Sequence, residues 1–307
     1  MDEVDVAILR EINTNCRVSY RALARKTDLS PNAIKHRLEK LVDEGVITRF
    51  AIKLSVAMAD ADGFLAFVIT DGTESISDFI SLIGDNPMVF HVSTLACVSG
   101  GAYFLAGEYS GSVMLSELGA FLRGLEQVQK VELHTMITTD LDTGRKTEFT
   151  KSQLKVLRCL LQDSRMQISE ISRMSKLSPR TVRRSLRELE EDGGISLTAS
   201  FDMAAGGFLD VFVRINWNDK MISVDELVQW LWKEYPLVFW APWSSASEPI
   251  MFADFLVKSH QEAELISRHI REAPFVISTT ILLAFSAAKF PYFTELKLKE
   301  MLDKAGV

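Results

Sequence analysis

The chain of 307 residues is longer than one hydrophobic core usually supports, so two or more domains are expected. Its hydrophobic content of 47% and its charged content of 24% are typical of a folded protein and exclude disorder over any large part. The net charge of -7 leaves nucleic-acid binding open, because such binding depends on the local charge of the contact surface.

The cysteines and the N-terminus indicate the kind of compartment. Cys16, Cys97 and Cys159 form no C-x-x-C pair and have no nearby histidine, so we predict buried thiols without a zinc site or disulfides. The start "MDEVDVAILREI" is acidic, whereas a signal peptide starts with basic residues. No apolar run reaches the roughly 20 residues of a membrane-spanning helix. We expect a cytoplasmic protein with no bound metal or cofactor and no membrane contact.

Two segments that lie 148 positions apart share one frame of residues. "LSPNAIKHRLEKLVDEGVI" begins at Leu29 and "LSPRTVRRSLRELEEDGGI" begins at Leu177. Each has a Leu-Ser-Pro start, basic residues, spaced leucines and a glycine with an isoleucine two positions later. The same offset aligns Arg17 with Arg165. A repeat of this length predicts two copies of one module of about 150 residues.

Each copy is predicted to begin with three helices. Apolar residues recur at helical spacing in "VDVAILREI" and "YRALARKT", and again in the matching part of the second copy. The third helix has an N-cap serine followed by proline, Ser30 with Pro31 and Ser178 with Pro179. The segments "VITRFAIKLSV" and "ISLTASFDM" follow these helices, and their alternating or β-branched residues predict a two-stranded wing.

The remainder of each copy is predicted to follow the order βαββαβ, which is the ferredoxin-like arrangement. In the first copy we expect strands at residues 64–69, 89–97, 103–109 and 131–138, and helices at 75–83 and 115–125. In the second copy we expect strands at 209–217, 238–242, 251–257 and 276–285, and helices at 224–233 and 262–271. An extra amphipathic helix, "TELKLKEMLDKAG", follows the last strand.

The predicted fold class is therefore α+β, with two tandem modules that each join a winged helix-turn-helix to a ferredoxin-like domain. The winged helix-turn-helix domains are expected at residues 1–52 and 149–203. The ferredoxin-like domains are expected at residues 60–142 and 206–307, the second with the extra C-terminal helix. The polar stretch "DLDTGRKTEFT", which contains a turn glycine, is expected to link the copies.

The third helix of the second copy has a strongly basic outward face. At about 100° per residue, Val182, Leu186 and Leu189 point inward. The four arginines Arg180, Arg183, Arg184 and Arg187 then share the outward arc. Guanidinium groups read guanine edges or bind phosphates, and a capped helix start can face a phosphate. We therefore predict DNA contacts from these arginines and from Ser178 and Thr181.

The third helix of the first copy is more mixed, and both helices have a second interpretation. Its predicted DNA contacts are Ser30, Asn32, Lys35, His36 and Lys40, but Glu39, Asp43 and Glu44 dilute the positive charge. A basic helix face can also be merely solvated, with Arg184 and Arg187 paired to Glu188 and Glu191. The second copy is the stronger DNA-binding candidate.

The two modules resemble the leucine-responsive regulatory protein/AsnC (Lrp/AsnC) family of transcription regulators. The stretch "DVAILREINTNCRVSYRALARKTDLSPNAIKHRLEKLVDEGVITRF" is similar to the family's winged helix-turn-helix, and "LKVLRCLLQDSRMQISEISRMSKLSPRTVRRSLRELEEDGGI" resembles it again. The ferredoxin-like parts resemble, more loosely, the family's RAM domain. The resemblance implies DNA binding through the third helices, oligomerisation through the second domain's sheet and, often, a small effector such as an amino acid.

The sequence departs from the family pattern in two ways. The family usually has one module per chain, so two modules indicate a covalent pseudo-dimer with unequal heads. The effector loop of the family typically has a glycine followed shortly by aspartate, whereas "VSGGAYFLAGEY" has alanine and tyrosine there and "ASEPIMFADF" has no glycine. The residues that would still serve an effector site are His91, Ser99, Gly100, Gly101, Trp240 and Trp243.

An enzyme is the alternative, because the same module also resembles sirohaem decarboxylases, whose subunits pair two such modules. That resemblance implies basic or histidine residues around a large pocket for a tetrapyrrole with many carboxylates. His91 and His134 lie on predicted strands and are candidates, although a lone histidine on a strand is more often structural. The aromatic cluster of residues 230–243 predicts either core packing or an apolar effector pocket.

The sequence favours a sequence-specific DNA-binding transcription regulator that is not an enzyme. It contains no pairing of a nucleophile with a base and no metal-ligand spacing, so no catalytic residues are predicted. The expected partners are double-stranded DNA, a small effector and either a second copy of the chain or the chain's own other half. Whether the two ferredoxin-like domains pair within one chain or between chains is left open.

Overall fold

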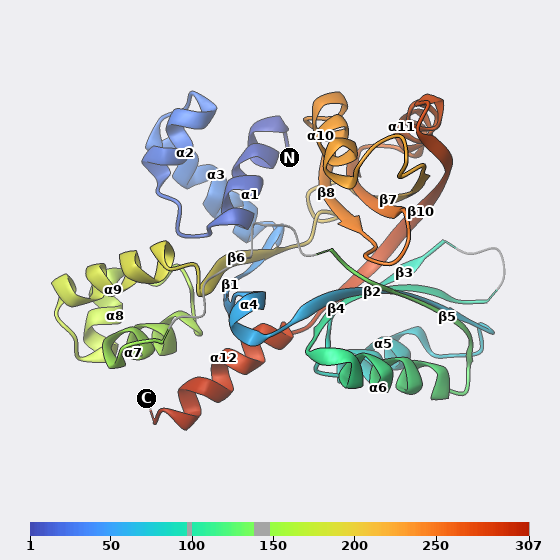
Figure 1. Ribbon diagram of the computed structural model, residues 1–307. Helices are drawn as coiled ribbons and strands as arrows, with labels where there is room; N and C mark the ends of the chain where they lie inside the picture. The colour runs from blue at the N-terminus through green and yellow to red at the C-terminus, as the bar shows by residue number, and fades with distance from the viewer. Residues whose placement is uncertain (97–99, 138–147, 307) are drawn as a thin grey trace. The chain divides into compact units, whose positions relative to one another are not determined.

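The computed structural model describes residues 1–96, 100–137 and 148–306, and they form two compact units (Figure 1). Unit 1 comprises Met1–Ala61, Thr139–Asp202 and Pro291–Val307. Unit 2 comprises Asp62–Thr138 and Met203–Phe290. Each unit thus contains one part from each copy: the two helical parts lie in unit 1, and the two ferredoxin-like domains lie in unit 2.

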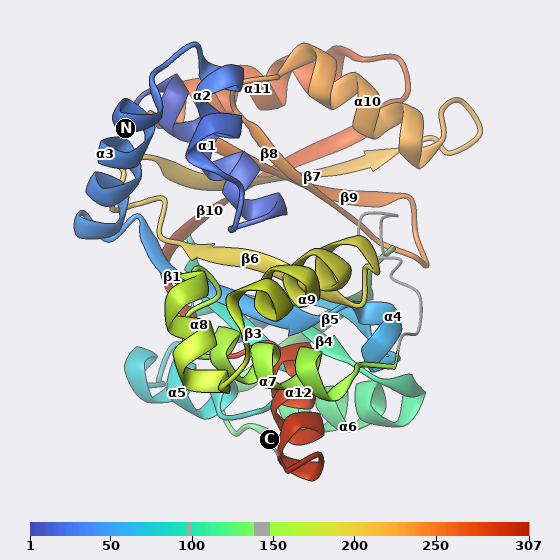
Figure 2. The same cartoon turned by 90° about the vertical axis from the view of Figure 1, so that its left-hand side faces the viewer.

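Unit 1 contains two three-helix bundles, which we call the first head and the second head (Figure 2). The first head consists of α1 (Glu3–Thr14), α2 (Tyr20–Thr27) and α3 (Pro31–Asp43), followed by β1 (Ile47–Leu54) and α4 (Val56–Ala59). The second head consists of α7 (Lys151–Leu160), α8 (Ile168–Ser175) and α9 (Pro179–Glu191), followed by β6 (Ile195–Phe201). The apolar stripes predicted for these helices are buried, as at Ile8, Leu9, Ile12, Val156 and Leu157.

The strands after the heads correct the predicted wings. β1 and β6 do not fold back within their own copies; they pair with each other as an antiparallel two-stranded sheet, with Leu54 opposite Ile195. Neither strand contains a glycine or proline that would turn it into a hairpin. The backbone hydrogen-bond partners of each strand lie in the corresponding strand of the other copy, so this two-stranded sheet connects the two heads.

The last helix, α12 (Phe293–Lys304), also differs from expectation, because it belongs to unit 1 and not to the second ferredoxin-like domain. It packs on β1 and α7 through the buried side chains of Phe293, Leu298 and Leu302. Its Glu295 accepts two hydrogen bonds from Arg49, at 2.7 and 2.9 Å. An amphipathic helix needs an apolar surface to cover, and here that surface lies on the heads.

Unit 2 joins the two βαββαβ domains into one antiparallel eight-stranded sheet of order β5-β2-β4-β3-β10-β7-β9-β8. The first domain has β2 (Asp62–Thr70), α5 (Ile76–Gly84), β3 (Val89–Leu95), β4 (Ala102–Tyr109), α6 (Gly111–Gly124) and β5 (Val128–Thr135). The second has β7 (Leu209–Trp217), α10 (Val224–Glu234), β8 (Phe239–Ser244), β9 (Ile250–Val257), α11 (His260–Glu272) and β10 (Val276–Lys289). Both agree with the predicted order.

Strand β10 answers the question of pairing. Its first half pairs with β7 of its own domain, and its end pairs with β3 of the other domain, where Ala284 lies opposite Leu95. On the far side, Met136 forms an isolated bridge with Ser245, so the chain beyond β5 reaches β8. The two ferredoxin-like domains therefore pair within one chain.

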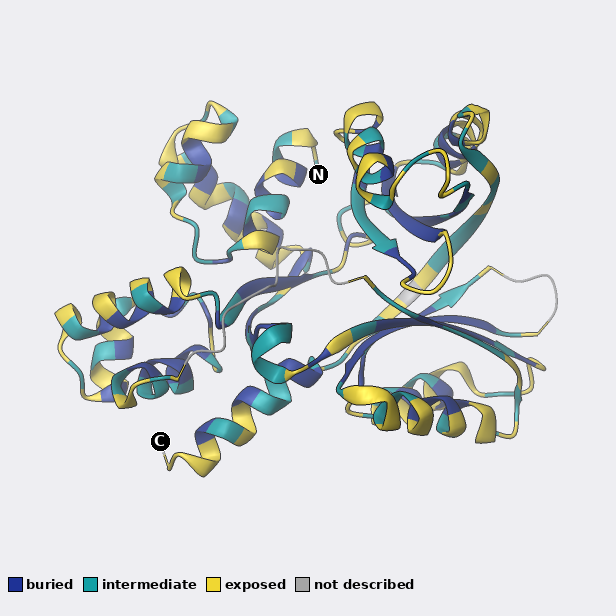
Figure 3. Cartoon of the chain, viewed as in Figure 1, coloured by how far each residue is buried: buried dark blue, intermediate teal, exposed yellow. Residues whose placement is uncertain are grey.

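The inward faces of the two domains share a core, which we call the inter-sheet core. It includes Phe67 and Phe104 of the first domain and Phe212 and Phe252 of the second. The rings of Phe67 and Phe252 lie 4.7 Å apart and those of Phe104 and Phe212 lie 4.4 Å apart. Strands β2 and β4 are largely buried (Figure 3), and β9 is buried along its whole length. Four phenylalanine rings thus pack between the strands of the first domain and the strands of the second. Among the described helices, none is long and apolar enough to cross a bilayer.

Candidate nucleic-acid interface

The helices α3 and α9 are fixed at their starts by the same device. The Ser30 hydroxyl accepts a hydrogen bond from the Ala33 backbone at 3.2 Å, and the Ser178 hydroxyl accepts one from Thr181 at 3.1 Å. A proline follows each cap, where its missing N–H is not needed. Ile34, Leu38 and Leu41 of α3 are buried, as are Val182, Leu186 and Leu189 of α9. The inward faces are therefore as predicted.

The outward face of α9 carries the unbalanced positive charge. Arg180, Arg183, Arg184 and Arg187 are all exposed, with Ser178 exposed and Thr181 half-buried at the start of the helix. Arg184 and Arg187 lie 3.6 and 3.8 Å from Glu188 and Glu191, so these two match the solvated-face interpretation. Arg180 and Arg183 have no acidic partner among the residues that the structure describes. The open charge of this head is concentrated near the start of the helix.

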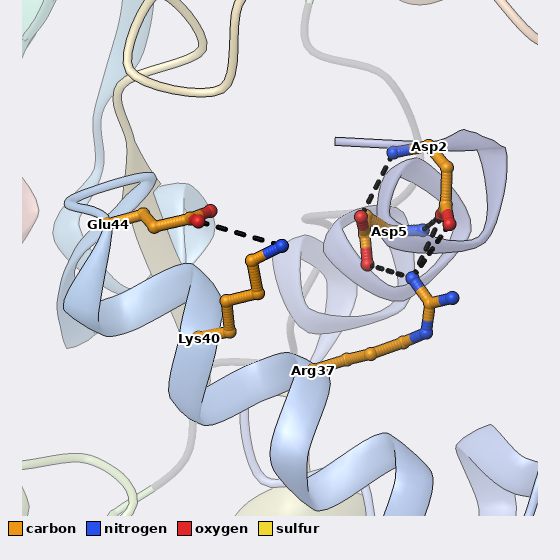
Figure 4. Close-up of polar contacts among 5 residues, drawn as sticks. All are labelled: Asp2, Asp5, Arg37, Lys40 and Glu44. Carbon is orange, nitrogen blue, oxygen red and sulfur yellow. Dashed lines mark hydrogen bonds and ion pairs between the residues drawn. The ribbon is translucent and has the colours of Figure 1, made fainter.

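The outward face of α3 is electrostatically self-contained. Ser30, Asn32, Lys35, His36 and Lys40 are exposed, as predicted. Glu39, however, lies 3.6 Å from the Lys35 ammonium group and 3.7 Å from the His36 ring. Lys40 lies 3.6 Å from Glu44, the pair drawn at the left of Figure 4. Each predicted cation of α3 thus has a carboxylate on its own helix or at its cap.

Arg37 of α3 has a structural role and turns away from this surface (Figure 4). Its Nη1 atom donates to Asp2 at 2.9 Å and to Asp5 at 2.7 Å, which join α3 to the start of α1. The bonds to Asp5 and Asp2 raise the pKa of Arg37. Partial burial favours a higher pKa for Asp2, but the Asp5 backbone N–H and Arg37 bring that pKa below its ordinary value. This cation is therefore not available to DNA.

The junction of the heads uses two arginines whose role the sequence analysis did not assign. Arg17 donates to the carbonyl oxygens of Ser164 at 2.6 Å and Met166 at 3.1 Å, and Arg165 donates to the carbonyl oxygen of Cys16. The Cys16 Sγ and Ser164 Oγ atoms lie 3.0 Å apart, within hydrogen-bonding distance. The signal was present in the 148-residue offset, which pairs Arg17 with Arg165 and Cys16 with Ser164. Residues at corresponding positions of the two copies therefore contact one another at this junction.

The residues predicted for an effector site do not form one described site. Gly100 and Gly101 lie beside Thr70 and Glu74, and the Gly101 N–H donates to the Thr70 hydroxyl at 3.0 Å. His91 is buried on β3, where its ring lies beside Phe104. Ser99 lies outside the described residues. Trp243 packs in the inter-sheet core, and Trp240 lies on β8. The aromatic cluster divides between two cores, since Trp230 and Trp232 of α10 pack against the core within the second ferredoxin-like domain.

The candidate histidines His91 and His134 lie among buried polar groups of unit 2 whose partners the sequence analysis did not assign. The Nδ1 atom of His91 lies 2.5 Å from the Lys289 ammonium group, and burial together with that charge lowers the pKa of His91 well below its ordinary value. Burial and the neighbouring Asp210 raise the pKa of Asp254 well above its ordinary value. His134 contacts Glu132, which also pairs with Arg214 at 2.7 Å. Alternation along the strands indicated the inward face, but not which strand of the other copy would supply each partner.

Comparison with known proteins identifies the heads. A family described as winged helix-turn-helix DNA-binding matches residues 1–48 and 149–195. Each head therefore matches this winged helix-turn-helix family over its three helices and the start of the following strand. The two matches lie on α1–α3 with the start of β1 and on α7–α9 with the start of β6, so both copies of the repeat are recognised separately.

Curated relatives match the same segments. Over 51 residues the chain is 49% identical to an uncharacterized HTH-type transcriptional regulator of Pyrococcus furiosus. The matched segment covers 17% of this chain and 33% of that protein. Over 53 residues it is 40% identical to the HTH-type transcriptional regulator LysM of Saccharolobus solfataricus, covering 17% of this chain and 37% of that protein. The chain therefore spans about a third of the length of these relatives. The predicted resemblance to Lrp/AsnC-type regulators is confirmed.

The whole chain is similar in fold to a solved siroheme decarboxylase, NirDL. That similarity has a TM-score of 0.58 at 14% sequence identity and covers 100% of both chains. At such identity it shows the fold alone. The predicted α+β class with two tandem modules is confirmed.

Proposed function

We propose that the chain is a DNA-binding transcription regulator whose two heads contact DNA unequally. The observation that carries the proposal is the pair Arg180 and Arg183, which are exposed on a winged-helix α9 without an acidic partner among the described residues. An uncompensated guanidinium at the start of such a helix can bind a guanine edge through two hydrogen bonds or clamp a phosphate. Ser178 and Thr181 lie at the same helix start and can donate to the DNA backbone.

The first head is expected to contribute backbone contacts more than base readout. Lys35, His36 and Lys40 must leave Glu39 and Glu44 before they bind a phosphate, and this exchange reduces the gain in free energy. Asn32 is the exposed residue of α3 that can bind adenine through two hydrogen bonds. We therefore expect an asymmetric operator, with one half-site read more stringently than the other.

The experiment that tests the proposal replaces Arg180, Arg183 and Arg184 together by alanine. Genomic fragments selected by the wild-type protein are used in a gel-shift titration at fixed salt. We expect specific binding to fall at least 100-fold, because each good bidentate contact is worth about 1–3 kcal/mol, while the fold is kept by the buried Val182, Leu186 and Leu189.

A matched control removes the same charge elsewhere. Replacing the exposed Arg123, Lys220 and Arg268 of unit 2 by alanine changes the net charge equally and leaves both heads intact. If both triple variants bound the selected fragments as the wild type does, α9 would not be the reading helix.

The remaining parts of the proposal concern assembly, effector and location. The chain would act in the cytoplasm as an intramolecular pseudo-dimer that can assemble further. A small effector would act through the ferredoxin-like domains, where Gly100, Gly101, His91 and Trp243 are the candidates. Melting temperatures measured in the presence of each common amino acid test this part, since a ligand that binds the folded state raises the melting temperature.

A second candidate function is that of a tetrapyrrole decarboxylase, which is favoured by the whole-chain fold similarity to siroheme decarboxylase NirDL. The buried His91 with Lys289 could hold a substrate carboxylate. Against binding in the inter-sheet core stands the packing of Phe67 on Phe252 and of Phe104 on Phe212, because a tetrapyrrole could enter there only by displacing these rings. Absorption spectra with added sirohaem separate the candidates: binding and loss of carboxylate groups without selection of DNA would favour the enzyme.

A further inference from the structure

An open groove of about 680 Å³ lies at the junction of the two heads, entirely within unit 1. Its walls come from the starts of α2, α8 and α9, together with the two loops that meet at the junction. Three arginines line it, Arg17, Arg165 and Arg183, one from each loop and one from α9. Among the described residues, no aspartate or glutamate lines the groove. The volume falls within the range of about 300–1,000 Å³ that is typical of small-molecule sites.

Backbone carbonyl oxygens fix the positions of Arg17 and Arg165, but no described carboxylate forms an ion pair with an arginine of the groove. Arg17 and Arg165 donate to backbone carbonyl oxygens, and Arg165 also lies over the Tyr20 ring at 5.4 Å. Burial and, to a smaller extent, the neighbouring Arg165 lower the pKa of Arg17, whereas Cys16, Glu190 and Asp163 act in the opposite direction; neither of the two carboxylates lines the groove. Placing like charges together in a partly buried site is costly unless an anion joins them.

The helix starts around the groove differ in one respect. Ser19 caps α2 by accepting a hydrogen bond from Ala22 at 3.2 Å. The matching residue of the second copy is Gln167, and its side chain makes no capping bond to α8. The first backbone N–H groups of α8, at Ile168 and Ser169, therefore have no acceptor among the described residues, and both residues line the groove. Such N–H groups and the helix dipole favour an anion.

We propose that this groove is a phosphate-binding site between the heads. The guanidinium groups of Arg17, Arg165 and Arg183 and the N–H groups at the start of α8 would donate to the phosphate oxygens. The phosphate belongs either to the DNA backbone between the two half-sites, in which case the inference rests on the proposed function, or to a small phosphorylated molecule. In both cases the bound anion neutralises the junction and stabilises one arrangement of the two heads.

The variant that tests the site is Gln167→Asp, made in the full chain. Aspartate is a preferred N-cap residue whose carboxylate accepts a hydrogen bond from the second or third N–H of the helix, so it should cap α8 and raise the melting temperature. It also places a negative charge in the groove, so it should weaken phosphate binding. Loss of binding together with higher thermal stability excludes misfolding as the cause. The matched control is Gln162→Asp, the same change at an exposed residue that does not line the groove.

Two probes distinguish the sources of the phosphate. Calorimetric titration with inorganic pyrophosphate at constant ionic strength measures binding of a free anion, and fluorescence anisotropy with a mixed-sequence DNA duplex measures binding of the backbone. A free ligand is indicated if pyrophosphate binds the wild type and the Gln162→Asp variant but binds Gln167→Asp at least tenfold more weakly. The DNA backbone is indicated if pyrophosphate does not bind and duplex affinity falls at least tenfold in Gln167→Asp alone.

The inference is overturned if Gln167→Asp changes neither titration relative to Gln162→Asp. If the duplex is then still bound and this binding depends on Arg180 and Arg183, the inference fails while the proposed function stands. If pyrophosphate binding depends on residue 167 and no duplex is bound at all, the site stands and the proposed function fails.

Discussion

The two heads share one buried frame and differ on their outward faces. The cap, the proline and the inward apolar residues recur at the same offset, and they produce the same α3 and α9. Outward, position 32 is asparagine where position 180 is arginine, and Lys35 corresponds to Arg183. Glu39 corresponds to Arg187, so one head pairs its own cations while the other leaves two arginines open. Folding constrained the first set of residues, and the second set was free to diverge.

The largest expected effect comes from exchanging the outward residues between the heads. The change Arg180→Asn with Arg183→Lys gives α9 the residues of α3, and it should reduce specific DNA affinity about 100-fold or more, at about 1–3 kcal/mol for each bidentate contact. The reverse change, Asn32→Arg with Lys35→Arg, should strengthen binding and make the two half-sites more alike. Footprinting of both variants on the selected fragments measures this.

The two double variants serve as controls for the fold. Both double variants keep the helix caps and the buried leucines, so circular dichroism should be unchanged in each. If α9 with the residues of α3 kept its footprint, the difference between the heads would have no role in recognition.

The two ferredoxin-like domains of unit 2 also differ, in their buried titratable groups, and we expect this difference to affect the stability of the protein. The buried titratable groups of the first domain include His91 and His134, whereas those of the second domain include the carboxyl groups of Asp210 and Asp254. Burial and then Asp210 raise the pKa of Asp254, so the folded state holds a proton that the unfolded chain releases near its ordinary pKa of about 4. Stability should therefore fall as pH rises from about 4 toward the raised pKa of the folded state.

The change Asp254→Asn removes this dependence. Asparagine keeps the size of the side chain and carries no charge, so we expect the variant to be more stable than the wild type at pH 8 and the gain to disappear near pH 4, where Asp254 is protonated in both the folded and the unfolded chain. Thermal denaturation between pH 4 and pH 8 measures it, with the exposed Asp219→Asn as control. An equal gain at both ends of this range would show that the pair is not the cause.

The sequence predicted whatever depends on local pattern. Caps, helix periodicity and strand alternation placed nearly every element within a few residues, and the 148-residue offset gave the inward and outward faces of α3 and α9. The contacts between copies were not predicted: the pairing of β1 with β6, the bridging strand β10 and the packing of α12 on the heads. Each joins segments far apart in the chain, and no periodicity within either segment specifies the partner.

The smallest expected effect concerns Glu39, which keeps the first head neutral. The change Glu39→Gln leaves Lys35 and His36 without their carboxylate, and an exposed pair of this kind is worth only about 0–1 kcal/mol. We expect a gain of no more than about fivefold in DNA affinity and a steeper salt dependence, because a further phosphate contact forms and releases counterions. Glu191→Gln, which frees Arg187 on the other head, is the matched comparison. Because Arg187 lies far along α9 from Arg180 and Arg183, its release should add less than that of Lys35, which lies in the first turns of α3. Equal gains from the two changes would mean that the heads differ in total charge and not in where that charge lies.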